Sequence, residues 1–400
     1  MFLRGSVKMY KRPCILFVLL IIIAGMVGCA TPQDAGYFNV VNTPTVTGTV
    51  NAVVPSPLPV NIDGVTVNDG CVPSIPYYYQ IADNMIAGHT SWSKLGFTPA
   101  MGAVSATTES DVWSAGGVYA FPTTAQQMQV VSTNNTDDIG TVIFDGDSSG
   151  GSTTTLVDVT KDFTFGTPVA INDVILLDTT KEYGFVTSVA ATTLTCSGGF
   201  SSGGSGTGQA YRVIDTSATA GAQVVAVEYL DASYNTQWEY VVLNGTTVVN
   251  TVSISLYRIN SFRVISAGAN KKPTGNLVIR NTAGTTNYSY ISAGYTRARN
   301  SAYTIPAGYT LYIAQLTYSF GYSANQTHYA RIYGRATQNN NFRTDGIFYP
   351  FTEVICANSS ATINLDFPSK FLEKVDIKVS GVATVTGSAD IALRGWIETQ

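Results

Sequence analysis

The sequence predicts an all-β protein made of antiparallel β-sandwich domains, jelly-roll-like in type, with a small β-barrel inserted into one of them. Short runs of β-branched and aromatic residues alternate with turn residues along most of the chain, and no amphipathic helix of convincing length follows the N-terminal segment. Charged residues make up only 12% of the chain, against roughly 25% in an average soluble domain. Gly, Ser, Thr, Asn and Tyr take their place, which is typical of β-sandwiches and their loops.

Changes in pattern divide the chain into five predicted parts. These are a signal-like segment at 1–29, an extended Pro/Val tether at 30–76, a discontinuous sandwich formed by 77–140 plus 217–285, the inserted barrel at 141–216, and a C-terminal sandwich at 286–400.

The N-terminal segment has the pattern of a secretory signal. Residues 1–12 carry four basic side chains and no acid, and the run from Ile15 to Val27 is apolar or small. This run is shorter than the roughly 20 residues that span a bilayer. The residues "MVGC", ending at Cys29, resemble the bacterial lipobox, although Met26 stands where Leu, Val or Ile is usual. The segment therefore predicts lipid attachment at Cys29; the alternative is cleavage elsewhere, with Cys29 an ordinary thiol.

The tether combines valines at two-residue spacing with four prolines between residues 44 and 59, which argues against a continuous central strand. It is predicted to lie along a neighbour or form a stalk, and a loose linker is the alternative. Tyr77, Tyr78 and Tyr79 follow it. Exposed, they would form a contact patch; the alternative is a plug where the tether meets its domain.

Several segments between 77 and 285 are predicted strands, including "AQQMQVVS", "VVAVEYLD" and "RINSFRVISAG". In "QWEYVVLNGTTVVNTVS", Asn244-Gly245 separates two β-rich runs, which predicts a hairpin with a tight turn. The segment from 141 to 216 contains five predicted short strands and a Gly/Ser-rich loop. This density of strands is typical of a small barrel, and we expect the insertion to be dispensable for folding.

Strict alternation marks the C-terminal part and predicts one buried and one solvent-facing side of each strand. The predicted buried positions are Val375, Ile377 and Val379, then Leu311, Ile313 and, less regularly, Leu316, and finally Ile391, Leu393 and Ile397. The predicted solvent-facing positions are Lys374, Asp376 and Lys378.

No pattern of catalytic residues stands out in the sequence, so no catalytic residue, metal or cofactor is predicted. The two histidines lie apart from any Cys or Asp pattern, and the three cysteines beyond Cys29 are too widely spaced for a zinc site or a disulfide scaffold. Residues 145–150 copy the first half of a calcium loop, but Leu156 stands where the closing Glu belongs, so a polar turn is expected.

Charge limits the partners that the chain is expected to bind. Removing residues 1–28 removes four positive charges, which changes the formal net charge from −4 to −8. An acidic chain without a basic stripe argues against nucleic acid. Arg331, Arg335 and Arg343 form a loose basic group, interpreted as a solvated loop or as a contact for an acidic neighbour or glycan.

Four segments resemble tailed-phage virion structural proteins of the head-decoration or fibre type, over most of residues 77–320. They are "AGHTSWSKLGFTP", "SDVWSAGGVYAFPTTAQQMQVVSTNNTDD", "VEYLDASYNTQWEYVVLNGTTVVNTVSISLYRINSFRVISAG" and "SAYTIPAGYTLYI". The resemblance implies a non-enzymatic structural protein on the virion surface, with the tether docked on capsid or other virion proteins. It also implies a homo-oligomer, with a trimer as the first expectation.

The export-type signal departs from this family, because a virion protein assembled in the cytoplasm has no use for one. A surface-anchored bacterial lipoprotein of the outer envelope, acting as an adhesin or glycan-binding module, is the main alternative. In another alternative, the apolar run from Ile15 to Val27 is a hydrophobic anchor buried in the particle or its partners. A polysaccharide-cleaving enzyme is the third function class, because two carboxylates can be brought together by folding from any sequence spacing.

Overall fold

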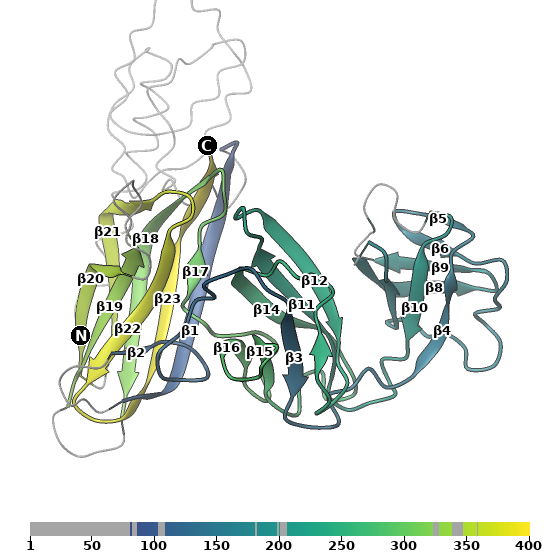
Figure 1. Cartoon of the computed structure of the whole chain (residues 1–400), viewed down its shortest axis with the longest axis horizontal. Helices are drawn as coiled ribbons and strands as arrows, with labels where there is room; N and C mark the ends of the chain where they lie inside the picture. The colour runs from purple at the N-terminus through teal and green to yellow at the C-terminus, as the bar shows by residue number, and fades with distance from the viewer. Residues whose placement is uncertain are drawn as a thin grey trace, which may run out of the picture. The chain divides into compact units, whose positions relative to one another are not determined.

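The computed structural model describes residues 81, 86–102, 109–180, 182–197, 200, 206–322, 328–337, 347–357 and 359–400. Every named element in these residues is a β-strand and all strand pairings are antiparallel, which confirms the predicted all-β, antiparallel class (Figure 1). Contacts divide the chain into Met1–Ile86 and Ala87–Gln400, and all the strands belong to the second unit. Among the described residues, no helix has the length and hydropathy needed to cross a membrane.

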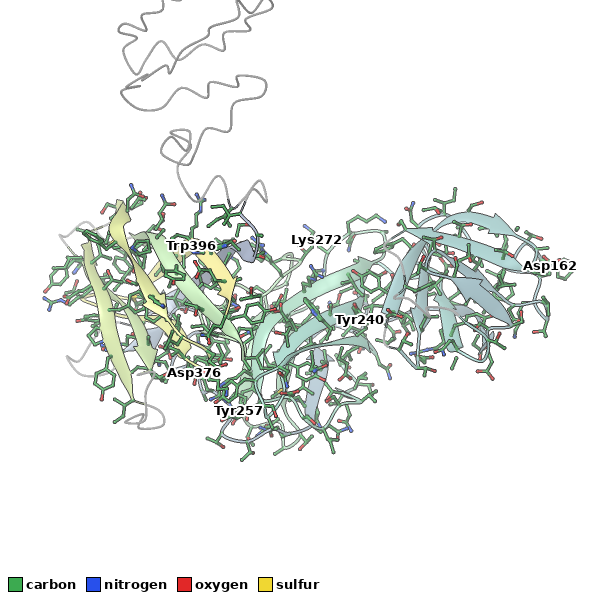
Figure 2. All side chains as sticks on the ribbon, turned by 90° about the horizontal axis from the view of Figure 1, so that it is seen from above. Asp162, Tyr240, Tyr257, Lys272, Asp376 and Trp396 are labelled. Carbon is green, nitrogen blue, oxygen red and sulfur yellow. The ribbon has the colours of Figure 1, made fainter. Side chains whose placement is uncertain are left out.

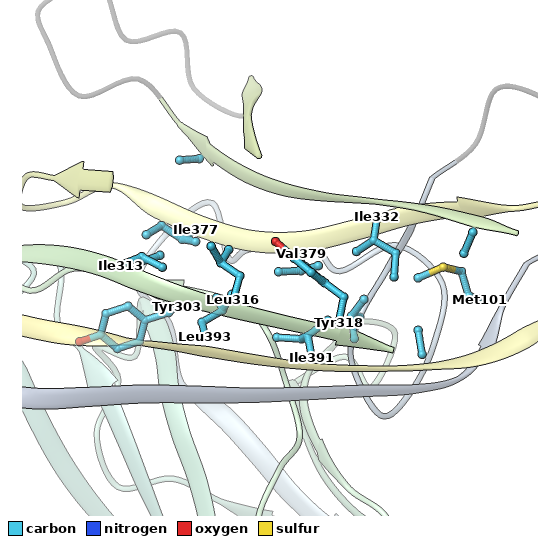
Figure 3. Close-up of a cluster of buried hydrophobic side chains, with 14 of the residues drawn as sticks. Met101, Tyr303, Ile313, Leu316, Tyr318, Ile332, Ile377, Val379, Ile391 and Leu393 are labelled. Atoms are coloured by element: carbon cyan, nitrogen blue, oxygen red, sulfur yellow. The ribbon is translucent and has the colours of Figure 1, made fainter. Parts of the chain in front are cut away.

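Two sheets that share one core form what we call the C-terminal module. Their strand orders are β1-β23-β18-β21 and β17-β22-β19-β20, and β2 also pairs with β22. The strands are β1 (His89–Met101), β2 (Ser110–Asp111), β17 (Tyr303–Thr304), β18 (Tyr309–Gly321), β19 (Ala330–Thr337), β20 (Phe348–Cys356), β21 (Ser359–Phe371), β22 (Asp376–Ala383) and β23 (Gly387–Thr399). The buried side chains between the sheets include Ile313, Tyr318, Ile332, Ile377 and Leu393 (Figure 3).

The pairing of β1 corrects the predicted domain boundaries. β1 pairs with β23 from His89, opposite Glu398, to Met101, opposite Gly387. Residues 89–101 and 110–111 therefore belong with the last strands of the chain and not with the discontinuous sandwich to which 77–140 was assigned. Gly96 permits this close pairing, because a Cβ there would lie 2.9 Å from Ile391 Cγ1.

The predicted alternation in the C-terminal module is confirmed on its buried side. All of the predicted buried positions are at most 4% exposed except Ile397, which is half-buried opposite Leu311. The irregular spacing between Ile313 and Leu316 is a β-bulge, since the register of β18 shifts there against both of its neighbours. The predicted solvent-facing side is wrong for Asp376, which is only 4% exposed because residues of β14 and β17 cover it.

Two further sheets, β12-β11-β14 and β13-β3-β15-β16, form the middle module. The strands are β3 (Met128–Ser132), β11 (Ala222–Leu230), β12 (Thr236–Val242), β13 (Val249–Asn250), β14 (Arg258–Ala267), β15 (Leu277–Asn281) and β16 (Asn287–Ile291). Both sheets contribute to one core, for example Val130, Val227, Phe262 and Ile279. β16 lies beyond the predicted limit at residue 285, because it completes the sheet by pairing with β15.

Asn244-Gly245 lies in a tight turn, as predicted, because Thr247 N–H donates to Asn244 O at 2.9 Å and the two residues form an isolated antiparallel bridge. The turn does not join two paired strands of one sheet, which corrects the predicted hairpin. β12 pairs with β11, whereas β13 pairs with β3, so the two flanking strands lie in different sheets. Gly245 has a φ of 54°, and a Cβ on it would lie 2.9 Å from Asn135 Cα. The glycine is required here by a close loop-to-loop approach between the sheets.

The seven strands between 142 and 214 form one sheet, ordered β4-β10-β7-β8-β9-β6-β5, which we call the inserted module. They are β4 (Val142–Asp147), β5 (Gly150–Ser152), β6 (Thr155–Val157), β7 (Val174–Leu177), β8 (Glu182–Ala190), β9 (Thr193–Ser197) and β10 (Ala210–Ile214). Five strands were predicted here, and the two that were missed are β4 and β5. The sheet encloses its own core, which includes Phe163, Leu194 and Tyr211.

Residues 145–150, which resemble half of a calcium-binding loop, lie mainly in paired strands. Asp145 pairs with Arg212 and Asp147 with Ala210, in the ladder between β4 and β10. Within the described ranges, no group of three or more His, Cys, Asp or Glu side chains could hold a metal ion.

The side chain of Asp137 links the two segments through which the chain leaves the middle module and returns to it. Its carboxylate, which is fully buried, accepts four hydrogen bonds. The donors are Ser132 Oγ (2.6 Å) and the backbone N–H groups of Ala222 (2.8 Å), Thr274 (2.8 Å) and Gly275 (2.7 Å). Nearby, the N–H of Gly221 donates to Thr136 O at 3.1 Å, so the two ends of the insertion are adjacent.

We expect Asp137→Ala to lower the free energy of unfolding by about 3 kcal/mol or more, because several buried donors lose their acceptor at once. Denaturant unfolding measures this. The matched control is Asp138→Ala, whose side chain accepts one local bond from Gly140 N–H and should cost about 1 kcal/mol or less. Equal losses in the two variants would contradict the role assigned to Asp137.

Candidate functional site at the module junction

The structure separates the residues that the sequence singled out. Cys29, Tyr77, Tyr78, Tyr79 and Arg343 lie outside the described residues, whereas Arg331 and Arg335 lie on β19.

Both described arginines have carboxylate partners within the chain. Arg331 Nε lies 3.3 Å from Glu353 Oε1 on the neighbouring strand β20. Arg335 forms a two-pronged contact with Glu109 and also donates to Ser380 Oγ at 3.0 Å. An acidic neighbour would have to displace these internal partners, so the predicted basic group is not the best candidate for a site.

A buried ion pair joins the middle and C-terminal modules. Arg258 on β14 donates from Nε and Nη2 to the two carboxylate oxygens of Asp376 on β22, both at 3.0 Å (Asp376 is labelled in Figure 2). The two side chains are 6% and 5% exposed. Thr304 Oγ1 donates to Asp376 at 2.6 Å, and Arg258 also donates to Pro122 O. Because both charges are paired and hydrogen-bonded, burying them is tolerated.

Asn260, two residues along β14 from Arg258, extends this junction. Its side-chain amide donates to Thr304 O at 2.8 Å and accepts from Thr304 N–H at 2.9 Å. The Asn260 amide therefore makes the pair of hydrogen bonds to Thr304 that a neighbouring strand would make to β17. These bonds fix the position of β14 relative to β17.

The inserted module packs on the other end of the same middle sheet. An apolar cluster joins Val174, Leu176 and Ile214 of the insertion to Val224 of β11. The rings of Tyr183 and Tyr240 meet edge to face at 4.7 Å (Tyr240 is labelled in Figure 2). β11 is consequently buried on both faces, since its other side contributes to the core of the middle module.

A cavity of about 230 Å³ lies beside the ion pair and is lined by both modules. Lys94 of β1 enters it and donates to the backbone oxygen of Asn260. Trp92 and Tyr303 supply aromatic walls, and Glu228 of β11 is the one carboxylate in the lining.

The cavity perturbs both of its central charged groups. Burial lowers the pKa of Lys94 to about 8; Glu228 raises it and Arg297 lowers it further. Burial also raises the pKa of Glu228, against the effect of Lys94 and Arg263. Perturbed charges in a cavity are typical of binding sites, and this makes the cavity the best candidate site.

A second cleft, of about 420 Å³, lies between the inserted and middle modules. Its charged groups have internal partners: Arg212 pairs with Asp178, and Glu239 accepts from the N–H groups of Val252 and Ser253. The cavity around Lys94 therefore offers more charged groups that a ligand could bind than this cleft does.

No protein-family model matches the chain, and neither a curated protein nor a solved structure is significantly similar to it. The resemblance to phage virion proteins thus stays an expectation drawn from the sequence segments quoted above.

Sequence reasoning missed the cavity, because its residues come from five separate segments. Lys94 and Glu228 are 134 positions apart and neither belongs to a motif. One signal was present: the "AQVVAVEYL" run of β11 lacks alternation, as expected of a strand buried on both faces, and Glu228 is the one charged residue in it.

We expect Arg258→Ala and Asp376→Ala each to lower the free energy of unfolding by about 3–5 kcal/mol, because each leaves a buried charge unpaired. The double variant Arg258→Met with Asp376→Leu should cost clearly less than the sum of the two. Denaturant unfolding provides the values. Arg331→Ala, which breaks the exposed pair with Glu353, is the control and should cost about 1 kcal/mol or less.

Deleting residues 141–216 should leave a folded protein. The segments that flank the insertion already meet at Thr136 and Gly221, and a change in loop length costs only about 0.6 kcal/mol per doubling. The deletion uncovers Val224, Val242 and Ile265, so we also expect lower solubility, restored by polar substitutions at Val242 and Ile265. Thermal melting tests the prediction. Loss of the cooperative transition, even in the polar-substituted deletion, would show that the insertion belongs to the main core.

Proposed function

We propose that the chain is a non-enzymatic structural protein of a virion surface, of the capsid-decoration or fibre type. The observation that carries the proposal is how its modules are joined: by the buried pair of Arg258 with Asp376 on one side, and by the apolar cluster around Val224 on the other. Such joints resist bending at the linkers, which suits a protein that projects from a particle. The segments that resemble tailed-phage virion proteins also support this proposal.

We further propose that the two-sheet modules are jelly-roll-like sandwiches and that the inserted module closes into a barrel. In each sandwich, two antiparallel sheets share a single core. In the inserted module, the terminal strands of the sheet, β4 and β5, are separated by only two residues of chain, so the two free edges lie close together.

The proposed partners are capsid or other virion proteins and further copies of the chain. Residues 30–76 would provide the contact, with a trimer as the expected state. The acidic mature charge argues against nucleic acid as a partner. Light scattering on residues 30–400 tests the oligomer, and a concentration-independent monomer mass would end this part of the proposal.

Quantitative mass spectrometry of purified particles tests the virion role. We expect the protein at a stoichiometry fixed relative to the major capsid protein. Detection only in the envelope fraction of the producing cells, with none in the particles, would reject the proposal.

One observation favours a second candidate, a lipid-anchored bacterial surface protein that binds a partner or glycan. The lipobox-like residues 26–29 follow a basic and then an apolar segment. Metabolic labelling with a palmitate analogue distinguishes the two. Label that disappears in Cys29→Ser, but persists in the control Cys71→Ser, would establish the anchor.

A further inference from the structure

Lys94 is an incompletely compensated cation. Its ammonium group donates to a backbone oxygen, Asn260 O, and lies 5.6 Å from the centre of the Tyr303 ring. Among the described residues, no carboxylate lies within ion-pair distance of it. A buried ammonium with this environment is costly, and a bound anion would compensate it.

The surroundings add more positive than negative charge. Arg297 lines the cavity, and Arg263 lies next to it through an isolated backbone bridge between the two residues. Both side chains are exposed, and neither makes an ion pair within the described part of the chain. With Glu228 as the only carboxylate in the lining, the site is cationic within a protein whose net charge is −4.

The rest of the lining is polar and aromatic. Ser93, Ser261 and Ser289 supply hydroxyl groups, while Trp92 and Tyr303 supply ring surfaces. Hydroxyl groups beside aromatic rings suit a ligand with hydroxyls on its edge and C–H groups on its faces. The volume of about 230 Å³ is small, below the roughly 300–1,000 Å³ of most ligand pockets.

We propose that this cavity binds a single carboxylate-bearing sugar unit, with Lys94 and Arg297 holding the carboxylate and the serine hydroxyls and aromatic walls holding the ring. Ammonium and guanidinium groups form charge-assisted hydrogen bonds to carboxylates. The site is independent of the virion role, since its chemistry is set by the cavity alone and would serve equally in an envelope protein.

Isothermal titration of residues 30–400 with glucuronate, and separately with glucose, tests the proposal. Glucuronate is expected to bind and glucose to bind at least tenfold more weakly. Lys94→Met and Arg297→Gln should each weaken glucuronate binding at least tenfold, whereas the matched control Lys370→Met, on β21 outside the cavity, should leave it unchanged. Arg297 is exposed, so its variant reports on binding even if Lys94→Met fails to fold.

Acetate and inorganic phosphate distinguish a sugar site from a simple anion site. If they bind as tightly as glucuronate, the sugar part of the proposal is wrong. If glucuronate does not bind, or if it binds equally well to Lys94→Met, Arg297→Gln and the unmodified protein, the cavity is not the site.

The pH dependence gives a second readout. Glucuronate affinity should fall as the pH rises above about 8, where Lys94 loses its proton. The other charged or titratable groups near Lys94 are Arg263, Arg297, Glu228 and Tyr303, and burial raises the pKa of both Glu228 and Tyr303. Affinity that stays constant from pH 7 to 10 would exclude Lys94 as the carboxylate ligand.

Discussion

The pairing of Arg258 with Asp376 is the constraint on which the arrangement of the middle and C-terminal modules depends. Both groups are removed from water, so each requires the other, and the requirement fixes β14 against β22 to within a hydrogen-bond length. The side-chain amide of Asn260 then binds the backbone of Thr304, and the same approach of the two modules encloses the cavity around Lys94. The cavity at this junction is thus a consequence of the same contacts that join the two modules.

The three-stranded sheet β12-β11-β14 is the element that all three modules share. One face contributes to the core of the middle module, while the opposite face receives the insertion at Val224 and approaches the C-terminal module at Glu228. Asp137 fixes the loops at the edge of this arrangement by accepting bonds from segments far apart in the chain. The inserted module covers apolar side chains of this sheet, so it contributes to burial there even though its two ends could be joined directly.

Local physical patterns explain what could be predicted from the sequence. Alternation located Val375, Ile377 and Val379 in the core, and the three-residue step from Ile313 to Leu316 is the bulge that the structure contains. Pairing partners could not be predicted in this way, because alternation shows which face of a strand is buried but not which strand lies beside it. β1 was therefore assigned to the wrong module, and the strands on either side of the Asn244-Gly245 turn were assigned to one hairpin although they pair in different sheets. Asp376 was expected in solvent for the same reason: its partner, Arg258, is 118 positions away.

These joints make the described modules one cooperative unit. Differential scanning calorimetry on residues 30–400 tests it most directly, since it compares the calorimetric with the van't Hoff enthalpy of unfolding. We expect a single main transition with a ratio of the two enthalpies near one, which separates into two transitions when Asp376→Ala removes the joint. Two or more independent transitions in the unmodified protein, unaffected by Asp376→Ala, would contradict it.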